Sequence, residues 1–226
     1  MIEDASVYIV DDDNAVRDSL ALLFKTVRMN ARTFISPHEF LACSDLAHPG
    51  CILLDLRMPE LNGLEVLTRL HERSEMMPVL IVTGYGNAPT AVRAVKLGAK
   101  EFLEKPVNEE FLIERVQHWV DADARSRQEL AHHASLTAHL NSLSQRERQV
   151  LDCILAGMSN KEAARQLAIS PKAIEIYRAH LMKKMEARTV VDLVLEVAGC
   201  IKCRGAPVID PPCLAPSKRG RFEHWA

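Results

Sequence analysis

Five short apolar segments alternate strictly with helix-like segments in the first 120 residues of this 226-residue chain. The sequence predicts strands at residues 7–10, 31–34, 51–54, 79–82 and 101–103. Helical spacing and capping residues predict helices at 14–27, 63–73, 88–97 and 109–120, with a further one opening at Ser36. Parallel strands need crossover connections, which are usually helical and right-handed. The alternation therefore predicts an α/β domain with a doubly wound five-stranded parallel sheet, covered by helices on both faces.

Polar side chains follow four of the predicted strands directly. Asp11 and Asp12 follow the first strand, Asp55 the third, Thr83 the fourth and Lys105 the fifth. The carboxyl ends of parallel strands meet at one edge of a sheet, where open α/β proteins bind ligands. A single Asp after a strand often only caps the next loop, and this reading stays open for each residue alone. The coincidence of four strand ends favours a functional site.

The residue types in this set suit phosphoryl chemistry with a metal ion. Three crowded carboxylates repel one another and need a cation, and Mg²⁺ prefers oxygen ligands. A metal ion and a lysine ammonium can together hold a phosphoryl group, while an aspartate carboxylate can itself be the nucleophile. Thr83 would then hydrogen-bond the new phosphoryl oxygen, and a mobile aromatic residue, for which Phe102 is the candidate, would follow that movement.

Composition and charge limit the classes of protein. Residues 1–120 carry 12 Lys and Arg against 18 Asp and Glu, whereas residues 144–188 carry 9 against 5. This split predicts an acidic regulatory module joined to a module that binds a polyanion. The sequence has no run of 18 apolar residues, and its acidic start lacks a signal-peptide core, so we expect a cytoplasmic protein without a membrane partner. Its six scattered cysteines are expected to be reduced thiols.

From Ser144 onward the pattern changes to short helices alone. Helices are predicted to open at Ser144, Ser159, Ser170 and Thr189. The first two start with capping boxes, in which a Glu three residues later returns the hydrogen bond of the serine. Residues 168–170 join the second helix to the third, which predicts a helix-turn-helix within an all-α, four-helix domain.

The third of these helices has an apolar face and a basic face. With Ile174 as the core direction, Tyr177 and Leu181 lie on the same side at about 100° per residue. The opposite face suits a DNA major groove, where apolar groups meet thymine methyls, lysines meet phosphates and a glutamate accepts from cytosine. The predicted DNA contacts are Lys161, Lys172, Glu175, Ile176, Ala179, Lys183 and Lys184. The alternative is a small helical bundle whose basic face is only solvated.

The first 120 residues resemble a response-regulator receiver domain, a domain with a flavodoxin-like fold. Besides the polar strand ends, the resemblance is carried by Asp-Leu-Arg-Met-Pro at 55–59 and Glu-Lys-Pro at 104–106. It implies a phosphoacceptor role for Asp55, a Mg²⁺ site made by Asp11, Asp12, Asp55 and the Arg57 carbonyl, and phosphoryl contacts or switching by Thr83, Phe102 and Lys105, with a cis bond before Pro106. Phe102 stands where many relatives have Tyr, so a switch hydroxyl is absent there.

Residues 144–200 resemble the four-helix DNA-binding domain of LuxR/FixJ/NarL-type regulators. The matching segments are 143–147, Gly157, 160–164, 170–172 and 183–185, while Tyr177 replaces a His common in relatives. The resemblance implies that the helix at 189–198 mediates dimerisation of the chain and that the DNA sites are paired half-sites. The predicted organisation is a receiver at 1–122, a helical linker at 123–142, the DNA-binding domain at 143–201 and a disordered tail at 202–226.

Together these patterns predict a two-component response regulator of the FixJ/NarL family. A sensor histidine kinase would phosphorylate Asp55 in the presence of Mg²⁺. Phosphorylation would promote a homodimer that binds double-stranded DNA and regulates transcription, with RNA polymerase as a further partner. The protein is expected not to be an enzyme, apart from slow loss of its own phosphoryl group.

Two alternatives stay open at this stage. Asp11-x-Asp13 after the first strand also resembles the nucleophile motif of haloacid-dehalogenase-type phosphatases, in which Asp11 rather than Asp55 would be phosphorylated. The lack of an obvious cap insertion and the helix-turn-helix pattern argue against it. The second alternative is a phosphorylation-independent DNA-binding protein whose receiver serves only as a dimerisation platform.

Overall fold

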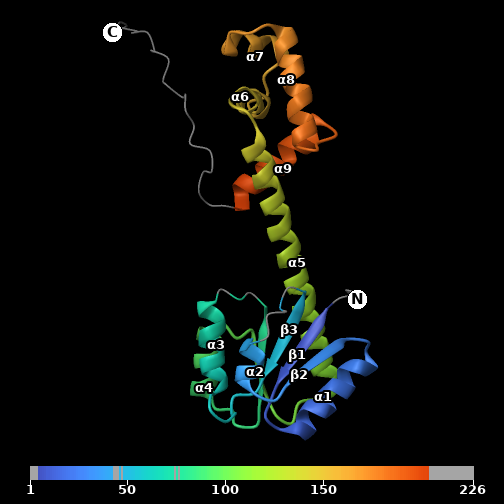
Figure 1. Cartoon of the computed structure of the whole chain (residues 1–226), viewed down its shortest axis with the longest axis vertical. Coiled ribbons are helices and arrows are strands. Elements are labelled where there is room, and N and C mark those ends of the chain that lie inside the picture. The colour runs from blue at the N-terminus through green and yellow to red at the C-terminus, as the bar shows by residue number, and fades with distance from the viewer. Residues whose placement is uncertain (1–4, 43–45, 47, 74, 76, 204–226) are drawn as a thin grey trace, which may run out of the picture. The chain divides into compact units, whose positions relative to one another are not determined.

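The computed structural model describes residues 5–42, 46, 48–73, 75 and 77–203. The chain divides into two compact units, Met1–Leu130 and Ala131–Ala226 (Figure 1). The predicted disordered tail lies outside the described residues from 204 onward. Among the described residues, no helix is both long enough and apolar enough to cross a lipid bilayer.

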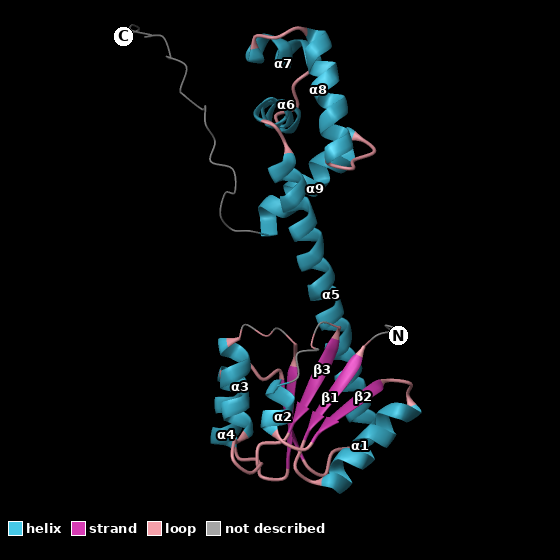
Figure 2. Cartoon of the chain, viewed as in Figure 1, coloured by secondary structure: helices cyan, strands magenta, loops and turns pink. Residues whose placement is uncertain are grey.

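The first unit contains one sheet of five parallel strands, as the alternating pattern predicted (Figure 2). The strands are β1 (Ser6–Val10), β2 (Asn30–Phe34), β3 (Gly50–Leu54), β4 (Val79–Thr83) and β5 (Glu101–Glu104). Their order in the sheet is β2-β1-β3-β4-β5, so the direction of winding reverses between β1 and β3. In open α/β sheets this reversal opens a crevice at the carboxyl ends of the strands.

Helices cover both faces of this sheet. They are α1 (Asn14–Thr26), α2 (Pro37–Ala42), α3 (Gly63–Glu72), α4 (Ala88–Lys96) and α5 (Glu109–Ser142). Side chains alternate along β3, so Ile52 and Leu54 join the core beneath α2, α3 and α4, whereas Cys51 and Leu53 join the core beneath α1 and α5. Because both faces are covered, the central strands are continuous apolar runs and not alternating ones. The predicted fold class is confirmed.

Helix α5 extends well past the predicted end of the receiver. The last helix of that domain was expected to stop near Val120 and to be followed by a helical linker at 123–142, whereas α5 runs without a break to Ser142. No Gly or Pro lies between Val107 and Leu143, so nothing in the sequence stops the helix. Apolar contacts with the sheet stop at Val120, but the buried Asp123 still belongs to the first unit.

The second unit is built from helices only, within the described residues. They are the last part of α5, from Ala131 onward, and α6 (Gln145–Leu155), α7 (Asn160–Leu167), α8 (Pro171–Lys184) and α9 (Val190–Cys203). Both predicted capping boxes are present, at Ser144 with Glu147 and at Ser159 with Glu162. Helix α7 ends at Ala168 in the left-handed conformation, which turns the chain into α8 and forms the helix-turn-helix.

Candidate functional site

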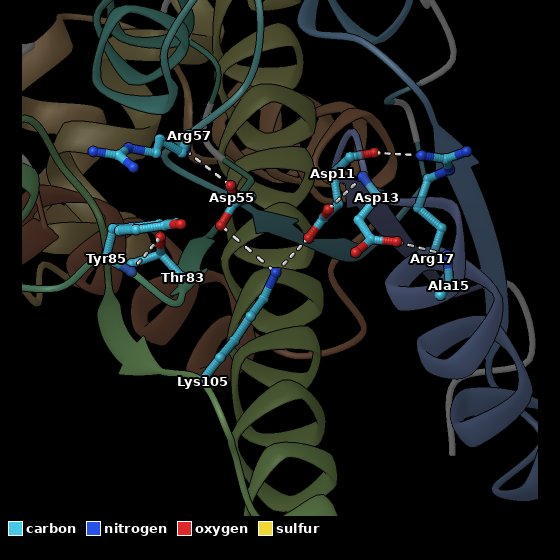
Figure 3. Close-up of polar contacts among 9 residues, drawn as sticks. All are labelled: Asp11, Asp13, Ala15, Arg17, Asp55, Arg57, Thr83, Tyr85 and Lys105. Atoms are coloured by element: carbon cyan, nitrogen blue, oxygen red, sulfur yellow. Dashed lines mark hydrogen bonds and ion pairs between the residues drawn. The ribbon is translucent and has the colours of Figure 1, made fainter.

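Three charged side chains from three strand ends meet at the carboxyl edge of the sheet (Figure 3). Asp11 follows β1, Asp55 follows β3 and Lys105 follows β5. The Lys105 Nζ lies 2.6 Å from the Asp11 Oδ2 and 3.6 Å from the Asp55 Oδ1. Residues that are far apart in the sequence are thus brought together at the point where the sheet reverses its winding. These strand-end residues therefore lie together at this edge, as the sequence pattern led us to expect, and their function stays a prediction.

The Asp55 carboxylate is held in one orientation. Its Oδ2 accepts a hydrogen bond from the Arg57 backbone N–H at 2.8 Å, while its Oδ1 faces the ammonium of Lys105. Burial raises the pKa of the Asp55 carboxyl above its ordinary value, although the charge of Lys105 and the Arg57 N–H both act to lower it. A buried and oriented carboxylate beside an ammonium group can attack an electrophile on its open side.

Asp11 is fixed by the turn that leads from β1 into α1. Its Oδ1 accepts the Asp13 N–H at 2.9 Å, and Asp13 in turn caps α1 by accepting the Ala15 N–H at 2.8 Å. The backbone carbonyl of Asp11 accepts a hydrogen bond from the buried guanidinium of Arg17 at 2.7 Å. Sequence reasoning missed this role of Arg17, because nothing in the helical pattern showed that its side chain turns back toward the strand end.

The side chains at this edge have an excess of negative charge, which a cation can balance. One ammonium lies between two carboxylates, and Asp12 adds a third, exposed carboxylate next to Asp11. No three His, Cys, Asp or Glu side chains within the described part of the chain lie close enough to form a complete metal cage. Mg²⁺ does not need one, since it binds one or two carboxylates and keeps several waters or phosphate oxygens. The donor set therefore fits Mg²⁺, while the roles of Asp12 and of the Arg57 carbonyl stay predictions.

Thr83 and Phe102 lie on the strands β4 and β5 at this edge of the sheet. Thr83 ends β4, is fully buried, and its hydroxyl acts on Asp55 as a hydrogen-bonding partner that lowers the pKa of that carboxyl. Phe102 is half-buried on β5 and packs against the core beneath α2, α3 and α4. The peptide bond between Lys105 and Pro106 is cis, as the receiver resemblance implied.

An aromatic residue that sequence reasoning missed lies beside the pocket. The guanidinium of Arg57 stacks over the ring of Tyr85, with 3.8 Å between the Arg57 Cζ and the ring centroid. Both side chains are exposed, and Figure 3 shows them on the Asp55 side of the cluster of polar side chains. The contact is a cation–π pair. Tyr85 follows the fourth strand by two residues, and that position was the only signal in the sequence.

Helix α8 has the two faces that its sequence pattern predicted. Ile174 and Leu181 are fully buried in the core of the second unit. The predicted DNA-contacting residues on this helix are all exposed: Lys172, Glu175, Ile176, Ala179, Lys183 and Lys184. The side chain of Ile176 is 49% exposed, although it is a large apolar residue. DNA contact itself stays a prediction for these residues and for Lys161, which is exposed on α7.

Lys184 differs from Lys172, whose ammonium bonds to Glu175 within α8 at 2.9 Å, because the ammonium of Lys184 has its partners on other helices of the unit. The Nζ lies 2.7 Å from the Glu147 Oε2 and donates to the Ser142 carbonyl oxygen at 3.1 Å. Hydrogen bonding to Lys184 and to the Ser144 N–H lowers the pKa of the buried Glu147 to about 2. Lys184 therefore joins the end of α8 to the start of α6 and the end of α5.

Comparison with known proteins matches one family to each of the two units. The response regulator receiver domain family matches residues 7–117, and the luxR family of bacterial regulatory proteins matches residues 141–197. The chain belongs to the response regulators that join a receiver domain to a LuxR-type helix-turn-helix domain. Within that class it is of the FixJ/NarL type, as its sequence motifs predicted.

Individual relatives cover nearly the whole chain. The transcriptional regulatory protein FixJ of Azorhizobium caulinodans is 40% identical over 194 residues, which are 86% of this chain and 92% of that protein. The response regulator protein TmoT of Ectopseudomonas mendocina is 38% identical over 85% of this chain and 87% of its own. Among solved structures, the response regulator StyR matches with a TM-score of 0.80 at 33% identity over 86% of this chain and 98% of its own. Full-length FixJ from B. japonicum matches with a TM-score of 0.55 at 38% identity over 87% and 97%.

Proposed function

We propose that this protein is a transcription factor switched by phosphorylation of Asp55. The observation that carries the proposal is the meeting of the Asp55 carboxylate with Lys105 and Asp11 at one sheet edge, in a chain that also contains a helix-turn-helix. A sensor histidine kinase is the proposed donor, since the chain is a response regulator. We also propose that the protein acts in the cytoplasm, because its proposed DNA target lies there.

The proposed reaction is phosphoryl transfer to the Asp55 carboxylate. An oxygen of Asp55 attacks the phosphorus of a phosphohistidine, an O–P bond forms, the N–P bond breaks, and the histidine nitrogen takes the electron pair. Mg²⁺, bound by Asp11, Asp12, Asp55 and the Arg57 carbonyl, would supply charge stabilisation for the phosphoryl oxygens. The ammonium of Lys105 would neutralise a further oxygen of the phosphoryl group. Its position between the two carboxylates supports this role. Apart from slow hydrolysis of its own acyl phosphate, the protein is proposed to turn over no substrate.

Phosphorylation is proposed to act on transcription through dimerisation. Thr83 and Phe102 would shift and remodel the face made by α4, β5 and the first turns of α5. Two phosphorylated chains then pair, and their α8 helices reach paired half-sites on double-stranded DNA. The second contact gains effective concentration from the first, so dimerisation raises affinity without any new contact to bases. Contact with RNA polymerase is proposed as the final step toward transcription.

Labelling by a small phosphodonor tests this function. The full chain is incubated with acetyl phosphate and Mg²⁺, and phosphorylated protein is resolved on a phosphate-affinity gel, with dimerisation followed by light scattering. Wild type is expected to be labelled and to dimerise, whereas Asp55→Asn is expected to do neither. Glu147→Gln is the matched control, because it removes a buried carboxylate from the other unit and should leave labelling intact.

The same experiment separates the two alternatives. A phosphatase of the haloacid-dehalogenase type would lose labelling through Asp11→Asn, keep it in Asp55→Asn and hydrolyse phosphomonoesters. A phosphorylation-independent regulator would dimerise to the same extent with and without acetyl phosphate. Either result would overturn the proposed function.

A further inference from the structure

Asp11 is the residue at which the chain leaves the sheet after β1. The last ladder bond to β3 is donated by the Asp55 N–H to the Val10 carbonyl oxygen at 2.9 Å. The last bond to β2 is donated by the Asp11 N–H to the Phe34 carbonyl oxygen at 3.3 Å. The Asp11 carbonyl group lies beyond both of these bonds, although the residue is buried. A buried carbonyl oxygen needs a donor, and the sheet no longer supplies one here.

Arg17, near the start of α1, is the donor. Helical side chains lean toward the amino end of their helix, so this side chain reaches back to the end of β1 (Figure 3). Its Nη1 donates to the Asp11 carbonyl oxygen at 2.7 Å, and its Nη2 donates to the Asn14 Oδ1 at 2.9 Å. Arg17 is buried, and among the described residues it forms no ion pair with a carboxylate. Its planar guanidinium therefore holds two neutral oxygens at fixed positions.

The bond to the Asp11 carbonyl oxygen fixes the peptide that joins Asp11 to Asp12. A peptide group is planar, so holding its oxygen restricts the backbone on both sides. The Asp11 carboxylate has further partners, the Asp13 N–H and the Lys105 ammonium. The Asp12 side chain is exposed, and within the described part of the chain it has no hydrogen bond or ion pair. The direction of the Asp12 carboxylate is therefore set by its backbone, and Arg17 holds that backbone.

We propose that Arg17 is a positioning residue for the divalent cation. Its guanidinium holds the peptide between Asp11 and Asp12, and with it the two carboxylates, in the orientation that binds Mg²⁺. The inference deepens the proposed function and rests on its Mg²⁺ site. Residues that orient metal ligands without touching the metal typically contribute tenfold or more to metal affinity.

The charge of Arg17 acts in the opposite direction to its geometry. A guanidinium close to two metal-binding carboxylates repels a divalent cation, so its removal would by charge alone tighten Mg²⁺ binding. Positioning predicts weaker binding after the same removal. Arg17→Lys separates the two effects further, because lysine keeps the positive charge but lacks the planar fork that reaches two acceptors.

Isothermal titration of the full chain with Mg²⁺ alone, without a phosphodonor, measures this effect. Arg17→Met and Arg17→Lys are both expected to bind Mg²⁺ about tenfold more weakly than wild type. Arg115→Met is the matched control, because it removes a guanidinium that bonds to Glu101 on β5 in the same unit, and it should bind Mg²⁺ as wild type does. Unchanged or tighter binding by Arg17→Met would overturn the proposal, and so would wild-type affinity in Arg17→Lys.

Asn14→Ala provides a test that does not remove the buried guanidinium. It deletes the second acceptor of Arg17 and should weaken Mg²⁺ binding less than Arg17→Met does. In the Arg17→Met background the same change should have no further effect, which gives a non-zero coupling in the double-mutant cycle. Equal effects in the two backgrounds would overturn the two-point contact. If thermal unfolding shows that Arg17→Met does not fold, Asn14→Ala and Arg17→Lys decide the question by their Mg²⁺ affinities.

Labelling with acetyl phosphate distinguishes a failure of this inference from a failure of the proposed function. The Mg²⁺ concentration that gives half of the maximal labelling rate should rise about tenfold in Arg17→Lys. The rate at saturating Mg²⁺ should return to that of wild type, because Asp55 and Lys105 are unchanged. A rate that stays low at saturating Mg²⁺ would show that Arg17 does not act through the metal and would overturn the proposal. A wild-type chain that binds Mg²⁺ but is not labelled would refute the proposed function, while the titrations would still decide the role of Arg17.

Discussion

Each unit of this chain contains a lysine that meets buried carboxylates, and the two sites are balanced differently. In the receiver, the single ammonium of Lys105 faces two carboxylates, Asp11 at 2.6 Å and Asp55 at 3.6 Å. In the second unit, the ammonium of Lys184 faces one carboxylate, Glu147 at 2.7 Å, and also donates to a backbone carbonyl oxygen. The first site has an excess of negative charge, whereas the second is neutral.

This difference distinguishes the site proposed to be phosphorylated from a structural ion pair. Glu147 also closes the capping box of α6 with Ser144, so its Oε2 already accepts hydrogen bonds from the lysine and from the helix start. The Asp11 and Asp55 pair lacks one positive charge, which a divalent cation can supply. A buried ion pair with complete partners holds helices together, while an incomplete set can take up a metal ion and a phosphoryl group.

The largest effect is expected from removing the cation. Chelation of Mg²⁺ with EDTA should reduce acetyl phosphate labelling of Asp55 at least about a hundredfold, because the charge excess of the pocket then repels the phosphodonor. A phosphate-affinity gel measures the labelling. Unfolding of the second unit serves as the control and should not respond to EDTA. Labelling that persists at the wild-type level without divalent ions would show that Lys105 alone balances the pocket.

Truncating the structural carboxylate should cost stability and leave labelling intact. Glu147→Ala is expected to destabilise the second unit by about 2–3 kcal/mol, since the Ser144 N–H loses its side-chain acceptor and Lys184 loses its carboxylate partner. Denaturant unfolding followed by circular dichroism measures the loss. Glu162→Ala is the matched control, because Glu162 closes the capping box of α7 without a lysine partner in its exposed position. Equal losses in the two variants would show that the cap, and not Lys184, stabilises the unit.

Acid should weaken the second unit through the same residue. The pKa of Glu147 falls from 4.5 to about 2 on folding, so its contribution is fully present above pH 4.5 and is lost as the pH falls toward 2. The loss is expected to be on the order of 1–2 kcal/mol, because the partly exposed Lys184 is screened by solvent. Unfolding measured in steps from pH 6 to pH 2.5 should show it in wild type but not in Glu147→Gln. A parallel pH dependence in the two proteins would assign the acid sensitivity to other groups.

A smaller effect is expected when each of the two lysines, Lys105 and Lys184, is replaced and the stabilisation by Mg²⁺ is compared. Lys105→Met leaves two buried carboxylates without their ammonium, so added Mg²⁺ should stabilise this variant by about 1 kcal/mol more than it stabilises wild type. Lys184→Met should lower stability by an amount that Mg²⁺ does not restore. Thermal unfolding with and without Mg²⁺ gives both values. If Mg²⁺ stabilises Lys105→Met less than wild type, Lys105 and the metal act together and do not compete for the carboxylates.

Residues 183 and 184 show where sequence reasoning reached its limit. The helical period placed both lysines near the basic side of α8, and both are exposed to some degree. Only the packed structure shows that Lys184 reaches Glu147, which lies 37 residues earlier in the chain. The continuity of the predicted helical linker at 123–142 with the last receiver helix was missed for a related reason. Local patterns show where a helix can continue, but they do not show which distant side chains pack beside it.

The sequence by itself determined the alternation of strands and helices, the capping boxes of α6 and α7, and the polar residues at four strand ends. These features depend on interactions within a few residues, such as the side-chain period and the bonding of a serine to the next turn. Only the tertiary structure decided which partners meet. Lys105 is 94 residues from Asp11, and β3 and β4 lie between their strands in the sheet. The two side chains meet because all the strands are parallel, which brings their carboxyl ends to the same edge. Strand order and packing set such contacts, and no short stretch of the chain encodes them.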